Sequence, residues 1–131
     1  MLEPGAFDVN EAWVAFQLND RPVCTEADGD FNVLALMDAA SDYIFGTAFV
    51  SVTSREPSKS ESVRLLQCGE TKAGTFPATL FVPERLRVDI LSAEAERRGI
   101  KVLRIPDEQL LRFIGEARRG FEAYMRGDGP R

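Results

Sequence analysis

The sequence predicts a single α/β domain in which a mixed β-sheet is flanked by helices. The chain has 131 residues, 44% hydrophobic and 28% charged, which suits one globular domain with one core. Two long apolar runs come first, and short apolar runs then alternate with amphipathic segments of helical period. We expect a domain over residues 1–125, with its core over residues 21–125, and a flexible tail over residues 126–131.

The N-terminal element is expected to be a short helical turn within residues 8–18. Asp8 is a suitable N-cap, and Ala12, Trp13 and Phe16 follow at i, i+1 and i+4 spacing. Trp13 and Phe16 precede the expected core. They are therefore expected either to cover the sheet or to dock on a second chain.

An antiparallel hairpin is expected next. Residues 31–37 and 43–52 are apolar, aromatic and β-branched, and turn signals at residues 27–30 and 38–42 bound the first of them. The first run is apolar throughout, which predicts a strand buried on both faces. The second run is long enough to need covering or pairing if it lies at a sheet edge.

The second half alternates helices with strands. Helices are predicted over residues 60–74, 84–98 and 107–125, and strands over residues 78–82 and 100–105. This alternation favours parallel strands joined by right-handed crossovers. The sheet should therefore be mixed, with an antiparallel hairpin followed by parallel strands.

Composition excludes several function classes. The chain has no histidine, which removes Ser-His-Asp and Cys-His catalysis and the histidine-containing zinc sites. No glycine-rich phosphate loop occurs. Cys24 and Cys68 follow no metal-ligand spacing and are expected to be reduced. No leader or membrane span is evident, so a cytoplasmic location is expected.

The charge pattern gives no strong case for a nucleic-acid partner. Net charge is −5, divided into −7 over residues 1–60 and +2 over residues 61–131. In the C-terminal half, arginines alternate with acidic residues at helical spacing, which favours ion pairs over a polyanion-binding face. The acidic cluster of Glu26, Asp28 and Asp30 lacks the further ligands of a calcium loop, and a solvated turn explains it better.

Three stretches resemble the core of retroviral-type integrases and transposases, which have a ribonuclease H-like fold. They are residues 34–52 (LALMDAASDYIFGTAFVSV), residues 76–91 (FPATLFVPERLRVDIL) and residues 95–106 (AERRGIKVLRIP). The resemblance covers about residues 30–125 and implies the ribonuclease H-like element order. It also implies chemistry in which three carboxylates hold two divalent ions.

Candidate site residues follow from this resemblance. Asp38 matches the first carboxylate, but Pro83 stands where the second is expected, with Glu84 beside it. Asp107, Glu108 and Glu116 are available for the third. Asp38 also has an alternative role in a turn, since Asp38 and Asp42 bracket one.

Two functions therefore stay open at the level of sequence. The first is a non-catalytic interaction or structural module on a degenerate ribonuclease H-like scaffold, with a second copy or another protein as its partner. The second is a nuclease or phosphoryl-transfer enzyme using Mg²⁺ or Mn²⁺, held by Asp38, Glu84 and either Glu108 or Glu116.

Overall fold

The computed structural model describes residues 7–19, 29–54 and 56–125 and contains one five-stranded mixed sheet. The strands are β1 (Ala12–Gln17), β2 (Phe31–Asp38), β3 (Ile44–Ser51), β4 (Thr79–Pro83) and β5 (Lys101–Ile105). Their order across the sheet is β3-β2-β1-β4-β5. β1, β2 and β3 pair antiparallel, whereas β1, β4 and β5 run parallel. The expected mixed sheet is confirmed.

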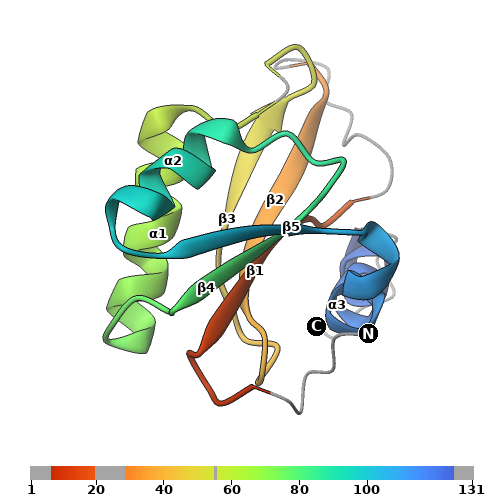
Figure 1. Cartoon of the computed structure of the whole chain (residues 1–131). Coiled ribbons are helices and arrows are strands. Elements are labelled where there is room, and N and C mark those ends of the chain that lie inside the picture. The colour runs from red at the N-terminus through yellow and green to blue at the C-terminus, as the bar shows by residue number, and fades with distance from the viewer. Residues whose placement is uncertain (1–6, 20–28, 55, 126–131) are drawn as a thin grey trace.

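Three helices cover the two faces of this sheet (Figure 1). α1 (Lys59–Ala73) and α2 (Asp89–Arg97) lie on one face, and α3 (Asp107–Met125) lies on the other. Each face has its own apolar cluster. Leu65, Leu66 and Leu91 pack on the α1–α2 side, and Leu110 and Ile114 pack on the α3 side.

β1 corrects the prediction for the N-terminal segment. Residues 8–18 do not form a helical turn; most of them form the central strand of the sheet. Trp13 belongs to the α1–α2 cluster and Phe16 to the α3 cluster, both with 0% exposure. Neither residue is available to dock on another chain, and the buried core extends upstream of residue 21.

Local signals account for both ends of α1. The Ser58 side chain caps the helix by accepting a hydrogen bond from the Glu61 amide, and Gly74 ends the helix at φ 87°. Between these ends, α1 lies close to the sheet. A Cβ added at Gly69 would lie 2.5 Å from Cη2 of the Trp13 ring, so this contact requires glycine.

The predicted start of the second helix at residue 84 is wrong, because α2 begins at Asp89. Residues 84–86 form a turn after β4, and the Arg104 guanidinium donates to the Leu86 carbonyl at 2.9 Å. The N-cap residue of α2, Val88, makes no side-chain cap hydrogen bond; a distant residue instead satisfies one first-turn amide, since Ile90 N donates to a Glu56 carboxylate oxygen at 2.8 Å. This contact joins residues 34 apart in sequence.

Candidate functional site

The parallel strands β1, β4 and β5 bring their carboxyl ends together at one edge of the sheet. Ligand sites of open α/β sheets form at such edges, and the carboxylates implied by the resemblance would have to meet here. Trp13 pairs with Leu80, and Pro83 pairs with Ile105. Continuing the first register places Gln17 of β1 beside Glu84, the residue after β4.

A guanidinium and two side-chain amides occupy the carboxyl end of β1. Arg118 of α3 donates from Nε to the Gln17 carbonyl at 3.0 Å. The side-chain amide of Gln17 donates to the backbone carbonyl of Asn19 at 2.7 Å. The side-chain oxygen of Asn19 accepts from the backbone amide of Val33 at 2.7 Å. Asn19 is buried. Among the residues that the structure describes, this end of β1 thus presents hydrogen-bonded amides and a guanidinium.

The candidate carboxylates near β4 are exposed and separate. Glu84 follows Pro83, and its amide donates to the Ile105 carbonyl at 2.9 Å while its side chain faces solvent. Glu108, in the first turn of α3, is also exposed, as is Asp107 before it. The side chain of Glu116 lies outside the described residues. Over the described ranges, no three acidic, cysteine or histidine side chains are placed to hold a metal ion.

Asp38 lies at the opposite end of the sheet from Glu84. It pairs with Trp13 across the β1–β2 ladder, and Trp13 in turn pairs with Leu80 of β4. Glu84 is four residues beyond Leu80, which is about 13 Å along a strand. The structure therefore does not bring Asp38 and Glu84 together, and they lie too far apart for both to hold one metal ion.

Hydrogen bonds within the protein account for the burial of the Asp38 carboxylate. Its carboxylate accepts from the Asn10 amide at 2.7 Å, the Ser41 amide at 2.9 Å and the Ser41 hydroxyl at 2.7 Å. The side chain is 1% exposed. Asp38 also accepts, through its backbone carbonyl, the amide of Asp42, which has φ 62°. Asp38 thus ties the segment before β1 to the β2–β3 turn, in the turn role considered from the sequence.

Sequence reasoning missed the partners of Asp38 and the cation at the end of β1. Asn10 has φ 66°, and its side-chain oxygen accepts from Trp13 Nε1 at 2.6 Å. An asparagine three residues before a buried tryptophan carries a weak turn signal. Arg118 carries none, because its bond to Gln17 joins residues 101 apart in sequence.

Ion pairs take up several of the arginines on and near α2. Arg97 and Arg98 both contact Glu94 at 3.3 Å, and Arg104 contacts Asp89 at 2.9 Å. These pairs agree with the interleaved charges of the sequence. Among the residues that the structure describes, no helix is long and apolar enough to cross a membrane. The cytoplasmic location stays a prediction.

Comparison with solved structures identifies the scaffold. A chain of the cryoEM structure of the simian T-cell lymphotropic virus intasome in complex with PP2A regulatory subunit B56 gamma matches with TM-score 0.63 and 9% identity. The match covers 90% of this chain but only 40% of that chain. The HTLV-2 integrase catalytic core domain in complex with magnesium, in its trimeric form, matches with TM-score 0.57 and 10% identity, covering 90% of this chain and 73% of that one.

The dimeric form of the same HTLV-2 domain matches with TM-score 0.51 and 10% identity, covering 83% of this chain and 82% of that chain. The chain therefore has the ribonuclease H-like fold of retroviral integrase cores, as the sequence resemblance implied. At these identities the likeness concerns the fold alone. Scans of protein-family models and of curated proteins found no match.

Proposed function

We propose that this chain is a non-catalytic interaction module built on a ribonuclease H-like scaffold. The observation that carries the proposal is the hydrogen bond from the Arg118 guanidinium to the Gln17 carbonyl at the carboxyl end of β1, the strand next to β4, which ends at Pro83. Divalent ions of the Mg²⁺ type are held by carboxylate and other oxygen ligands. A cation and a proline at the two neighbouring strand ends oppose such a site.

The charge of Arg118 is a second argument against metal binding at this strand end, beside the missing carboxylate at Pro83. A guanidinium carries a positive charge, and a positive charge at this strand end opposes a divalent cation there. Its bond to Gln17 also spans α3 and β1, which gives the residue a structural role. Glu84 alone, exposed to solvent, would hold a metal ion only weakly.

The partner in this proposal is a second copy of the chain. Phe49 of edge strand β3 is 64% exposed and packs against Phe31, with ring centroids 5.0 Å apart. Ile44 and Thr47 lie on the same face of the sheet and are partly exposed. This aromatic patch, Phe31, Ile44, Thr47 and Phe49, is uncharged, so two copies can meet across it without like-charge repulsion.

The dimer in this proposal forms through side chains rather than by continuation of the sheet. The Phe45 carbonyl accepts from Lys72 Nζ at 2.8 Å, and the Thr47 carbonyl accepts from Arg64 at 2.6 Å. These α1 side chains cover part of the β3 edge against strand pairing. HTLV-2 integrase cores have been solved in dimeric and trimeric forms, so related scaffolds do self-associate.

A metal titration tests the non-catalytic half of the proposal. A metal ion at a hundred times its dissociation constant would stabilise the fold by about 2.7 kcal/mol. For a chain of 131 residues this is a rise in Tm of roughly 10 °C. We expect no rise with millimolar Mg²⁺ or Mn²⁺ and no nicking of plasmid DNA. Metal-dependent nicking that Glu84→Gln abolishes would refute the proposal.

Light scattering tests the self-association half. We expect a dimer for the wild type and a monomer for Phe49→Ser. Leu111→Ser is the matched control, because Leu111 is 53% exposed on α3, outside the aromatic patch, and its replacement should leave the dimer intact. A wild-type monomer at millimolar concentration would overturn the proposed partner.

A further inference from the structure

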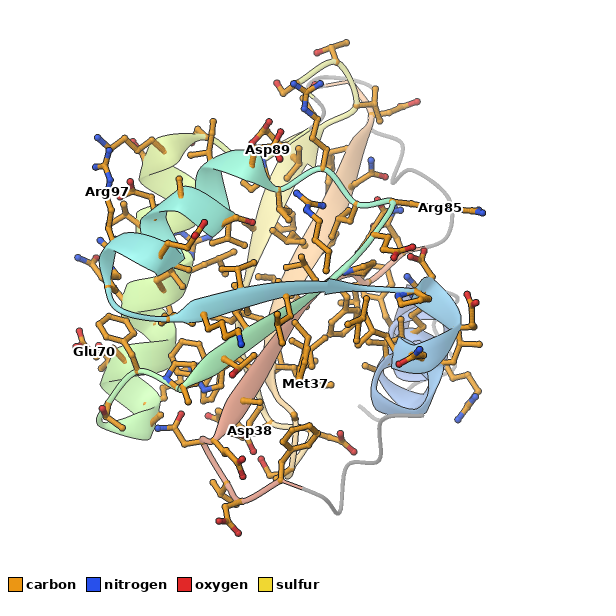
Figure 2. The ribbon with its side chains drawn as sticks, in the orientation of Figure 1. Met37, Asp38, Glu70, Arg85, Asp89 and Arg97 are labelled. Atoms are coloured by element: carbon orange, nitrogen blue, oxygen red, sulfur yellow. The ribbon has the colours of Figure 1, made fainter. Side chains whose placement is uncertain are left out.

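A hollow at the end of the sheet that carries Asp38 remains unexplained by the proposed function. It lies between the C-terminal end of α1 and the β2–β3 turn, and its lining includes Asp38, which Figure 2 labels in its lower half. Its volume is about 480 Å³, within the usual range of small-molecule sites. Its lining residues are Val9, Asn10, Asp38, Ser41, Tyr43, Phe45, Lys72 and Ala73.

Lys72 supplies a positioned positive charge in the hollow. Its Nζ donates to the Phe45 carbonyl at 2.8 Å and lies 5.7 Å from the centroid of the Tyr43 ring. An ammonium group has three N–H donors, so the bond to Phe45 leaves two for a ligand. The Phe45 carbonyl and the Tyr43 ring already restrict the Lys72 ammonium. Binding a ligand would therefore cost little further side-chain entropy at Lys72.

The other walls of the hollow are largely apolar. Val9 is 73% exposed and Tyr43 is 52% exposed, with Phe45 and Ala73 beside them. Exposed apolar side chains around a fixed cation suit a ligand with one charged end and one apolar end. The aromatic ring of Tyr43 favours a flat apolar group, which can pack against its edge or face.

Asp38 limits the charge that such a ligand can carry. Its carboxylate is 1% exposed and is satisfied by Asn10 and Ser41, so it is not aimed at a ligand as a binding group. Its negative charge nevertheless lies in the wall and opposes a second anionic group. One cation and one buried anion together favour a monoanion over a dianion such as a phosphate monoester.

We propose that this hollow binds a small monocarboxylate with an apolar body about the size of one aromatic ring. The carboxylate accepts hydrogen bonds from Lys72, and the ring packs against Tyr43 and Val9. The inference goes beyond the proposed function and does not depend on the aromatic patch around Phe49. Self-association and ligand binding can therefore fail separately.

The tryptophan provides a direct readout, because the chain has a single one, Trp13. Asn10 lines the hollow and accepts a hydrogen bond from Trp13 Nε1 at 2.6 Å. Phe45 also lines the hollow, and its ring lies 4.8 Å from the Trp13 ring. A ligand that contacts either residue should change the emission of Trp13.

The test is a titration of the full chain with phenylacetate, followed by Trp13 fluorescence. We expect a saturable change with the wild type. Lys72→Met should weaken binding about ten- to hundredfold, because it removes a charge-assisted hydrogen bond. Lys59→Met is the matched control, since Lys59 lies in the first turn of α1, about 20 Å along the helix from Lys72. Binding to this control should equal that to the wild type.

Two further measurements keep the test decisive if Lys72→Met does not fold. Phenylethylamine has the same ring with a positive charge, and it should not bind to the wild type. Lys72→Arg keeps the charge and should keep binding of phenylacetate within about tenfold. No saturable change with phenylacetate, equal binding of the amine, or full binding by a folded Lys72→Met would each overturn the inference. Phe49→Ser should bind as the wild type does.

Discussion

The contact between Gly69 and Trp13 gives the sharpest stability prediction. Gly69 lies in α1, and the ring of Trp13 in the central strand packs directly beneath it. A Cβ added at Gly69 would lie 2.5 Å from Cη2 and 2.7 Å from Cζ3 of this ring. Because Trp13 is wholly buried, its ring cannot move aside without disturbing its neighbours.

The magnitude follows from two opposing effects of Gly69→Ala. Replacing a helical glycine by alanine normally stabilises a helix by about 1 kcal/mol. Overpacking a core lowers the stability by about 1–3 kcal/mol. Because the Trp13 ring is rigid and buried, the loss at this site should be about 3 kcal/mol. The net loss is then about 2 kcal/mol. For a chain of 131 residues, 1 kcal/mol corresponds to about 4 °C, so Tm should fall by about 8 °C.

The assay is thermal unfolding followed by circular dichroism, with Gly120→Ala as the matched control. Gly120 is also helical, but a Cβ added there meets no atom within 4 Å. The control should therefore rise in Tm by about 4 °C. If Gly69→Ala were as stable as the wild type, the reasoning that seats α1 directly on Trp13 would be refuted.

Three other substitutions test the elements around the sheet, each by the same unfolding measurement. Asp38→Ala should lower the stability by about 2–3 kcal/mol, because it leaves the Asn10 amide and the Ser41 donors without their acceptor; an unchanged Tm would contradict this role. Gly74→Ala should cost about 1 kcal/mol, because an alanine at φ 87° is strained, and a rise in Tm would count against the cap. Ser58→Ala should cost about 1 kcal/mol and Ser58→Asp very little, since aspartate also caps; equal losses in both would exclude capping as the cause.

Glycine and proline residues at the ends of helices and strands made most elements after residue 31 predictable. α1 ends at Gly74 and α2 ends before Gly99, and both glycines have positive φ as helix-ending residues commonly do. β5 ends before Pro106, and α3 begins directly after it. Residues of this kind act through their own backbone conformation. Their effect can therefore be read without knowing the tertiary structure.

β1 escaped prediction because both of its faces are buried. Residues 12–16 are all apolar, so the run lacks the alternation that distinguishes a strand from a short helix. Spacing between Trp13 and Phe16 then fits either structure. What decides between them is the sheet itself, which pairs β1 with β2 on one side and β4 on the other.

The start of α2 was missed for a related reason. Its N-cap residue, Val88, makes no side-chain cap bond, and the acceptor for the first-turn amide of Ile90 is Glu56, 34 residues away in sequence. No sequence pattern near residue 89 predicts this long-range contact. The preceding residues also have helical propensity, which extends the expected helix back toward Pro83.

Strand direction explains why Asp38 looked like a site residue and why it is not placed as one. From the sequence, Asp38 ends an apolar strand just as Pro83 does, and the two ends look equivalent. β2 is antiparallel to β1, however, whereas β4 is parallel to it, so the two strand ends lie at opposite edges of the sheet. The position beside Pro83 belongs instead to the end of β1, where Arg118 bonds to Gln17. Placing β1 correctly therefore removes the one apparent match to a metal-binding carboxylate and adds a cation in its place.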